Sequence, residues 1–162
     1  MSEANDTITV VDLLNDVALE NIEQTELAAS RGDGKLGGDL PEAEPSYRLS
    51  IDGRDDDKAF RVGLRTEIQV GTGSIISEIR AEYLLGEMRF SAVEDATRLE
   101  FANKIAIMAI LPYTRQSIAD ITSRVFGAPL LMPIVQRGEL EFEVPTPTED
   151  MAGDDARASQ KS

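Results

Sequence analysis

The clearest pattern in the chain is the alternation of apolar and polar positions between residues 47 and 85. Tyr47, Leu49 and Ile51 alternate with Arg48 and Ser50, so the two sets point to opposite sides of an extended segment. The same period of two runs through residues 60–70 and again through 75–85, on either side of the short link GTGS. A period of two is typical of strands with one buried face, and short links favour antiparallel neighbours. The sequence therefore predicts a meander of three strands.

A fourth strand is predicted ahead of this meander, over residues 17–28. Its apolar residues Val17, Leu19, Ile22 and Leu27 start at a spacing of two and then slip out of phase, which is typical of a strand with a bulge. Residues 6–16 mix polar and apolar positions and are expected to form a short helix. Between the first two strands, residues 30–45 are rich in glycine and proline and predict a loop.

After residue 90 the period changes to that of a helix. Ser91 and Glu94 have the spacing of a capping box, which marks a helix start. Apolar positions then recur every three or four residues toward Gly127, which is placed as a C-terminal cap. Pro112 falls inside this segment and has no amide hydrogen, so we expect a kink there or a break into two helices.

Residues 105–111 of that helix are apolar around the whole circumference. Such a segment must be covered on every side, and one four-stranded sheet covers a single side. We therefore expect an α+β fold: a four-stranded antiparallel sheet with a long proline-interrupted helix packed on one face. Self-association, with helices sandwiched between two sheets, would cover the rest. The residues expected at this oligomer interface are Phe101, Ile105, Met108, Leu111 and Tyr113.

The chain beyond the helix is expected to contribute little regular structure. Residues 130–135 are expected to be extended, and residues 139–144 alternate like a short strand. Residues 146–162 contain no large apolar side chain except Met151 and predict a disordered acidic and polar tail. The expected organisation is one domain over residues 1–145, with a crossover loop at 31–45, followed by the tail at 146–162.

Composition narrows the chemistry that the chain can carry. The 162 residues include no cysteine and no histidine, which excludes disulfides, thiolate metal sites and the commonest general base. A net charge of −14 disfavours nucleic acid as a direct partner, because phosphates would be repelled. No apolar run approaches the roughly 20 residues of a membrane span, and the first ten residues lack a secretion signal. We expect a cytoplasmic protein without membrane insertion, metal or cofactor.

A glycine-rich stretch near the N-terminus has the spacing of a phosphate-binding motif. The segment RGDGKLGGD fits G-x-G-x-x-G through Gly32, Gly34 and Gly37. A dinucleotide site needs a helix to open at the last glycine, whereas Pro41 and Pro45 follow here. The Arg-Gly-Asp tripeptide at its start would need an extracellular protein. A flexible loop is therefore the favoured interpretation.

Acidic residues form no recognisable catalytic or calcium motif. In the segment 52–57, Arg54 occupies a ligand position of the EF-hand pattern, so a solvated turn is favoured. Pairs of neighbouring carboxylates stand without a nucleophile elbow or a glycine-rich pocket beside them. These pairs are Glu20 with Glu23, Glu94 with Asp95, and Glu149 with Asp150. A carboxylate enzyme is the least favoured hypothesis, and we expect no enzymatic activity and no catalytic residue.

One segment, AIMAILPYTRQSIADITSRVFGAPLLMPI at residues 106–134, resembles the SecB family of export chaperones. Leu111 to Gln116 match the family's helix element, which reads roughly L-F-P-Y-A-R-E. The downstream glycine and proline element is matched by Gly127, Pro129, Leu130, Met132 and Pro133. The order of the predicted elements agrees as well, so the resemblance covers about residues 13–135. The chain departs from the family in three ways: Gln116 replaces glutamate, the crossover loop lacks aromatics, and residues 138–144 replace a C-terminal helix.

This resemblance implies a homotetramer, a dimer of dimers, that holds unfolded or nascent polypeptides without ATP. The client would be a protein on its way to export, or an antitoxin that the chaperone guards. In the family the crossover loop and the next strand line the client groove, which implies Leu36, Leu40, Tyr47 and Leu49 here. Docking to the SecA motor would involve Ile76, Glu78, Glu20 and Glu23. The alternative is an acidic, non-catalytic interaction scaffold without holdase activity.

Overall fold

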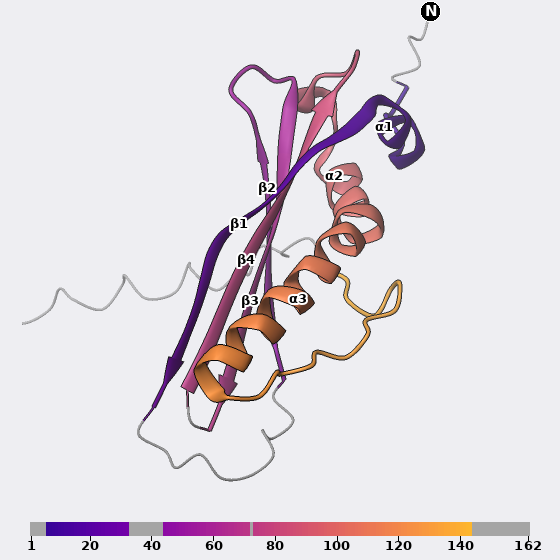
Figure 1. Ribbon diagram of the computed structural model, residues 1–162. Helices are drawn as coiled ribbons and strands as arrows, with labels where there is room; N and C mark the ends of the chain where they lie inside the picture. The colour runs from indigo at the N-terminus through magenta and orange to yellow at the C-terminus, as the bar shows by residue number, and fades with distance from the viewer. Residues whose placement is uncertain (1–5, 33–43, 72, 144–162) are drawn as a thin grey trace, which may run out of the picture.

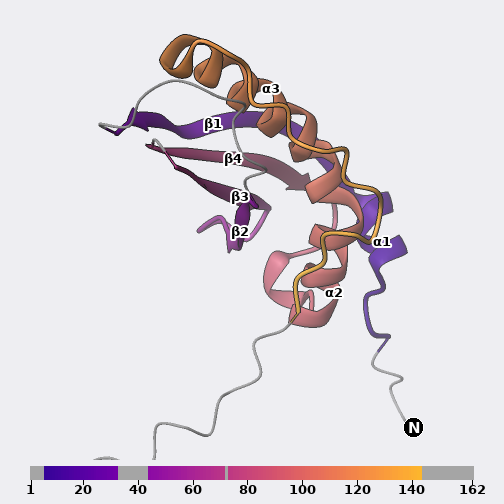
Figure 2. The same ribbon diagram turned by 90° about the horizontal axis from the view of Figure 1, so that it is seen from below.

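An antiparallel sheet and a layer of helices make up the described residues, 6–32, 44–71 and 73–143, of this computed structural model (Figure 1). The strands are β1 (Val17–Arg31), β2 (Ser46–Gly53), β3 (Ala59–Val70) and β4 (Gly73–Leu85). The helical elements are α1 (Val10–Asp16), the 3-10 turn η1 (Phe90–Ala92), α2 (Asp95–Phe101), the π-helical turn η2 (Ala102–Ala106) and α3 (Ile107–Phe126). The sheet has the order β1-β4-β3-β2, and the helices lie on one of its faces (Figure 2). The predicted α+β fold class is confirmed.

Helix α1 begins with a capping box of its own. The Thr9 amide donates to Asp12 Oδ2 at 2.9 Å, and the Asp12 amide donates to Thr9 Oγ1 at 3.2 Å. Two amides at the helix N-terminus are thereby satisfied. Leu13 is the buried residue of this helix and joins it to the core. The short helix expected within residues 6–16 is confirmed.

Strand β1 contains the irregularity that its sequence predicts. Its register against β4 shifts between Leu19 and Asn21 and again between Gln24 and Glu26. Each shift leaves one extra residue on β1, Glu20 and Thr25 respectively, as expected for a bulged strand. The bulges explain why the apolar residues of β1 drift out of the strict period of two.

The core between the sheet and the helices is centred on four aromatic rings. Phe60 stacks on Tyr83 and on Phe90, with ring centroids 5.4 and 5.3 Å apart. Phe101 of α2 meets Phe60 and Tyr83 edge to face, at 5.5 and 5.0 Å. Such pairs add about 0.5–1.5 kcal/mol each to the free energy of burial. The cluster fixes α2 against the end of the sheet where β3 begins.

The helix does not start where its sequence suggests. Glu94 is the N-cap of α2 but forms no capping hydrogen bond through its side chain, so the predicted capping box is wrong. Ser91 is engaged elsewhere: its amide donates to Asp57 Oδ1 at 2.8 Å and its hydroxyl donates to Asp57 Oδ2 at 2.5 Å. Asp57 adopts a left-handed conformation with φ 62° in the turn before β3. A tertiary contact to this turn therefore overrides the local capping pattern.

The interruption of the helix is not at Pro112. That residue lies inside α3, which continues through it to Phe126. The regular α-helical pattern breaks earlier, at η2, where the Ile107 amide bonds to the carbonyl of Ala102. A break into two helices at the proline is thus wrong, whereas a kink there stays a prediction. Pro112 is exposed, so the carbonyl that loses its partner there can be solvated.

The chain turns back after α3. Gly127 takes a left-handed conformation with φ 81°, which confirms the predicted C-terminal cap. Residues 128–143, here called the return segment, run back along α3 and η2 toward α2 (Figures 1 and 2). The strand expected at 139–144 is wrong for its described part, residues 139–143. These residues lie against helices, whose backbone groups are already bonded internally, so no ladder partner exists there.

Candidate functional site

An apolar groove of about 550 Å³ lies between the edge strand β2 and helix α2. We call it the β2–α2 groove. Its lining residues are Tyr47, Arg48, Leu49, Ile51, Asp95, Arg98, Leu99, Phe142 and Glu143. A mainly apolar lining with a few charged groups is the usual composition of a binding site for organic ligands and peptides.

The apolar side of the groove comes from the alternation along β2. Tyr47 and Leu49 lie opposite Thr66 and Leu64 of β3, which are fully buried. Helix α3 packs mainly on β4, β1 and β3, so the apolar residues of β2 stay only half-buried. This partial burial raises the pKa of the Tyr47 hydroxyl. The groove thus exists because the helical layer does not extend fully over β2.

Arg98 holds a positive charge beside the groove. Its guanidinium carbon lies 3.9 Å from the centroid of the Phe90 ring. It also donates to the Phe90 carbonyl at 2.7 Å and to Asp95 Oδ1 at 3.1 Å. These contacts fix the orientation of the guanidinium, while Asp95 neutralises it only in part because that carboxylate is highly exposed.

The structure brings together two of the four residues predicted for a client groove. Tyr47 and Leu49 line the β2–α2 groove, whereas Leu36 and Leu40 lie outside the described residues. The groove also contains Leu99 and Phe142, which sequence reasoning missed. Leu99 follows from the helical period, but Phe142 reaches the groove only through the path of the return segment.

A second hollow, of about 400 Å³, lies between β1 and α3. Ile22 and Leu27 line it from β1, and Tyr113 and Ile121 from α3. Tyr113 is 52% exposed and Leu27 is 38% exposed. Gln24, Gln116, Ser117, Asp120 and Arg124 line the same hollow, so this surface beside the edge strand β1, uncovered within the described part of the chain, combines exposed apolar side chains with polar ones.

The five residues predicted for an oligomer interface separate into three groups. Phe101 and Leu111 are buried in the core of the single chain. Ile105 and Met108 are half-buried against the same core. Tyr113 is the exposed member, and its role in an interface stays a prediction.

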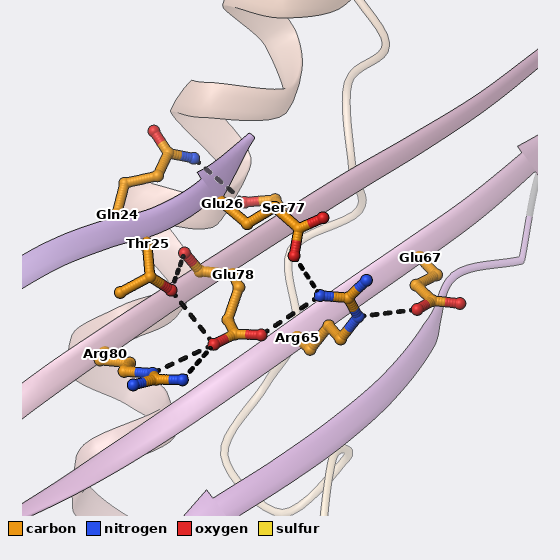
Figure 3. A network of polar contacts seen from close by, with 8 residues as sticks. All are labelled: Gln24, Thr25, Glu26, Arg65, Glu67, Ser77, Glu78 and Arg80. Carbon is orange, nitrogen blue, oxygen red and sulfur yellow. Dashed lines mark hydrogen bonds and ion pairs between the residues drawn. The ribbon is translucent and has the colours of Figure 1, made fainter. Parts of the chain in front are cut away.

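The outer face of the sheet, opposite the helices, carries a network of ion pairs (Figure 3). Glu78 of β4 accepts hydrogen bonds from Arg80 at 2.8 Å, from the Thr25 hydroxyl at 3.1 Å and from Arg65 at 3.3 Å. Burial opposes ionisation of Glu78, but the hydrogen bonds from Arg80, Thr25 and Arg65 together hold its pKa below the ordinary value. Glu78 is therefore a charged residue whose hydrogen-bonding capacity is largely in use.

The residues predicted for motor docking lie partly on this outer face. Glu23 is opposite Arg80 in the register, so it shares a face with Ile76 and Glu78. Glu20 is the extra residue of the first bulge and is exposed. A docking role for these four residues stays a prediction. The alternation along β3 could have identified Arg65 as the centre of the network, because it places that arginine on the outer face.

The described residues contain neither a membrane-spanning helix nor a cluster of metal ligands. Among the helices in that part of the chain, none is long and apolar enough to span a membrane. The same residues contain no group of three or more carboxylates arranged to hold a metal ion.

Comparison with known proteins identifies the architecture. No family model and no curated protein matches the chain. Among solved structures, a SecB-like chaperone of Mycobacterium tuberculosis, in complex with a ChAD peptide from the HigA1 antitoxin, aligns with a TM-score of 0.66. The identity is 19%, over 77% of this chain and 94% of that one.

A second solved structure, a protein of unknown function from Streptococcus agalactiae, aligns with a TM-score of 0.39 and 12% identity, over 74% of this chain and 98% of that one. The match to the Mycobacterium tuberculosis structure confirms, at the level of architecture, the resemblance that the sequence indicated. The chain has the SecB-like fold.

Proposed function

We propose that this protein is an ATP-independent chaperone that holds extended segments of unfolded polypeptides in the β2–α2 groove. The observation that carries the proposal is the row of half-buried apolar side chains along an edge strand, Tyr47, Leu49 and Ile51. On its other side β2 pairs with no strand among the described residues, so its outward amides and carbonyls are available to a client backbone. Addition of a peptide to a sheet edge is a common mode of recognition.

Such a site favours affinity without strict sequence specificity. Main-chain hydrogen bonds to β2 do not depend on the client's side chains, and apolar burial contributes roughly 25 cal/mol per Å². The ordering of a flexible client opposes binding, so each contact with one groove is weak. A net charge of −14 would keep the loaded complex from aggregating. Leu36 and Leu40 are proposed to extend the apolar surface from the crossover loop.

We further propose that assembly into a homotetramer joins several such grooves. The surface between β1 and α3, with the apolar Leu27 and the aromatic Tyr113 exposed on it, supports a contact between copies. Several grooves on one particle would bind a long client by avidity, which compensates for weak single contacts. The cytoplasm is the proposed location.

Two kinds of client fit this mechanism, an export substrate and an antitoxin. The peptide in the Mycobacterium tuberculosis structure comes from an antitoxin, which supports that class of client. The outer face supports the same choice, since Arg65 and Arg80 already neutralise Glu78 and leave less free acidic surface for the SecA motor. We therefore propose an antitoxin as the client, with export as the alternative.

The proposal is tested by the suppression of client aggregation. The full chain should prevent aggregation of heat-unfolded citrate synthase at near-stoichiometric ratios without ATP. The double variant Tyr47→Ser, Leu49→Ser should lose most of this effect, because it removes apolar area from the groove. Leu131→Ser is the matched control, since Leu131 is 77% exposed and lies outside the groove lining. Equal activity of all three proteins, or none in the unmodified chain, favours the non-catalytic scaffold instead.

A further inference from the structure

The side chain of Asn103 holds the backbone of Phe142 in a two-point contact. Asn103 Nδ2 donates to the Phe142 carbonyl at 2.8 Å, and the Phe142 amide donates to Asn103 Oδ1 at 2.9 Å. Both main-chain groups of one residue are satisfied by one carboxamide, as they would be by a neighbouring strand. We infer that Asn103 recognises the backbone of an extended peptide, and that Phe142 is an internal ligand occupying the position of an aromatic client side chain.

This contact does not depend on the side chain at position 142. The carboxamide engages only the amide and the carbonyl, so any residue except proline, which lacks the amide hydrogen, could take the position of Phe142. Selectivity must come from the groove beside it. There the Phe142 ring shares the lining with Tyr47 and Leu49, which favours an aromatic occupant.

The position of Asn103 depends on an uncommon local structure. It lies in η2, the single π-helical turn between α2 and α3. π-helical turns are rare and often occur at functional sites. Here the turn contains Asn103, whose side chain bonds to both main-chain groups of Phe142. The irregularity and the contact therefore occur in the same five residues.

The end of the return segment resembles a bound peptide more than a part of the core. Leu140 and Phe142 are half-buried against the core, while the acidic residues between and beside them are exposed. Besides the Asn103 contact, one long hydrogen bond of 3.5 Å from Arg137 to the Lys104 carbonyl joins this part to the helices. A segment with so few bonds opens at a low free-energy cost.

The charges around the groove indicate which peptides would replace it. Phe142 is flanked by Glu141 and Glu143. Glu143 lines the groove together with Arg98, and Glu141 lines a small hollow together with Lys104, which is also paired with Glu100. The cations on the protein side match an occupant with an aromatic residue between acidic ones. The inference rests on the proposed function and specifies its client as an extended segment of this type.

The test uses the full chain and a labelled peptide that copies the end of its return segment and the two residues that follow it in the sequence. The probe is fluorescein-GELEFEVP, the sequence of residues 138–145, and the control peptide replaces its phenylalanine with alanine. Fluorescence anisotropy should show that Phe142→Ala, which removes the internal ring from the groove and so makes the segment easier to displace from Asn103, binds the probe at least about fivefold more tightly than the unmodified chain. Adding Asn103→Leu, which keeps the size of the side chain but removes both hydrogen bonds, should weaken binding about tenfold.

Two measurements keep this test separate from folding and from the proposed function. Hydrogen exchange of the Phe142 amide in the otherwise unmodified Asn103→Leu protein should be faster, while that of β3 stays slow. Equal probe affinity of the unmodified chain and Phe142→Ala, or no effect of Asn103→Leu, overturns the inference even where citrate synthase is still protected. Tight probe binding by Phe142→Ala together with no protection of citrate synthase contradicts the holdase proposal but supports the peptide site.

Discussion

Arg48 of β2 and Arg65 of β3 lie directly opposite each other on the outer face of the sheet. Like charges in this arrangement are destabilising, so neighbouring acids must compensate. Arg65 donates to Glu67 at 2.8 Å, to Glu78 at 3.3 Å and to Glu26. One guanidinium thus connects residues of β1, β3 and β4 across the sheet (Figure 3).

Removal of Arg65 should change the titration of Glu78. A carboxyl with a lowered pKa contributes stability above its unfolded-state pKa, and this contribution is lost as the pH falls through the folded-state value. Arg65→Met removes one of the donors that lower the pKa of Glu78, so that pKa should rise. The loss of unfolding free energy between about pH 5 and pH 3 should become shallower. Carboxyl NMR titration and urea denaturation across this range check both expectations.

Arg124→Met, on the helical layer, is the control for this experiment and should leave the Glu78 titration unchanged. If Arg65→Met also leaves it unchanged, the network of Figure 3 does not hold the charge of Glu78 in solution.

Asp16 should be important for stability although it is near the surface. Its carboxylate accepts the amides of Gly86, Glu87 and Met88 at 3.0, 2.8 and 3.0 Å, which joins the end of α1 to the chain after β4. Asp16→Ala leaves the Glu87 and Met88 amides without their acceptor, while Gly86 keeps its bond to the Asp16 carbonyl, and should cost about 1–3 kcal/mol of unfolding free energy. Chemical denaturation measures the change. The exposed Asp55→Ala serves as control, and an equal loss in both variants would show that the contact is unimportant.

The hydroxyl of Tyr83 should be dispensable. It is buried without a hydrogen-bond partner in the described structure, and this burial raises the pKa of Tyr83 to about 12. Because the folded-state pKa lies above the unfolded one, stability is complete below about pH 10 and falls as the pH rises toward 12. Tyr83→Phe should match or exceed the unmodified protein by up to about 1 kcal/mol at pH 7. It should also flatten the decline between about pH 10 and 12, as followed by urea unfolding.

A charge placed between β1 and α3 should prevent assembly. Leu27 is half-exposed on the surface between β1 and α3 that is proposed as the contact between copies. Leu27→Asp would bury an unpaired carboxylate in that contact, which is strongly unfavourable. Sedimentation velocity should show a shift from tetramer to smaller species. Leu131→Asp, on the exposed return segment, should not change the distribution, and a tetramer that survives Leu27→Asp would exclude this surface as the interface.

The elements that follow local rules could be predicted from the sequence. The period of two gave β2, β3 and β4 because each has one buried face, and the phase slip in residues 17–28 revealed the bulges of β1. Gly127 was recognised because a left-handed residue at a helix end has few alternatives to glycine. Tyr47 and Leu49 were placed in the groove through the SecB resemblance rather than through any pattern of their own.

The errors arise where a distant residue decides the local structure. Ser91 fits a capping box, but Asp57, 34 residues earlier, takes its hydrogen bonds. Phe101 and Leu111 were expected between subunits because the helix is apolar all round, yet they are buried within one chain. Asn103 could not be predicted, because its partner Phe142 lies 39 residues away in a segment without regular structure.

The π-helical turn η2 also acts as a phase shift between two halves of one helix. It holds one residue more than an α-helical turn, which rotates the side chains after it by about 100° relative to an unbroken helix. Before the turn, Phe101 faces the aromatic cluster on β3 and β4; after it, α3 presents Tyr113 and Ile121 along β1. Deleting one residue within 102–106 would restore a regular helix and misalign one of these two packing surfaces with the sheet. A single extra residue thus allows one helix to pack on β3 and β4 before the turn and along β1 after it.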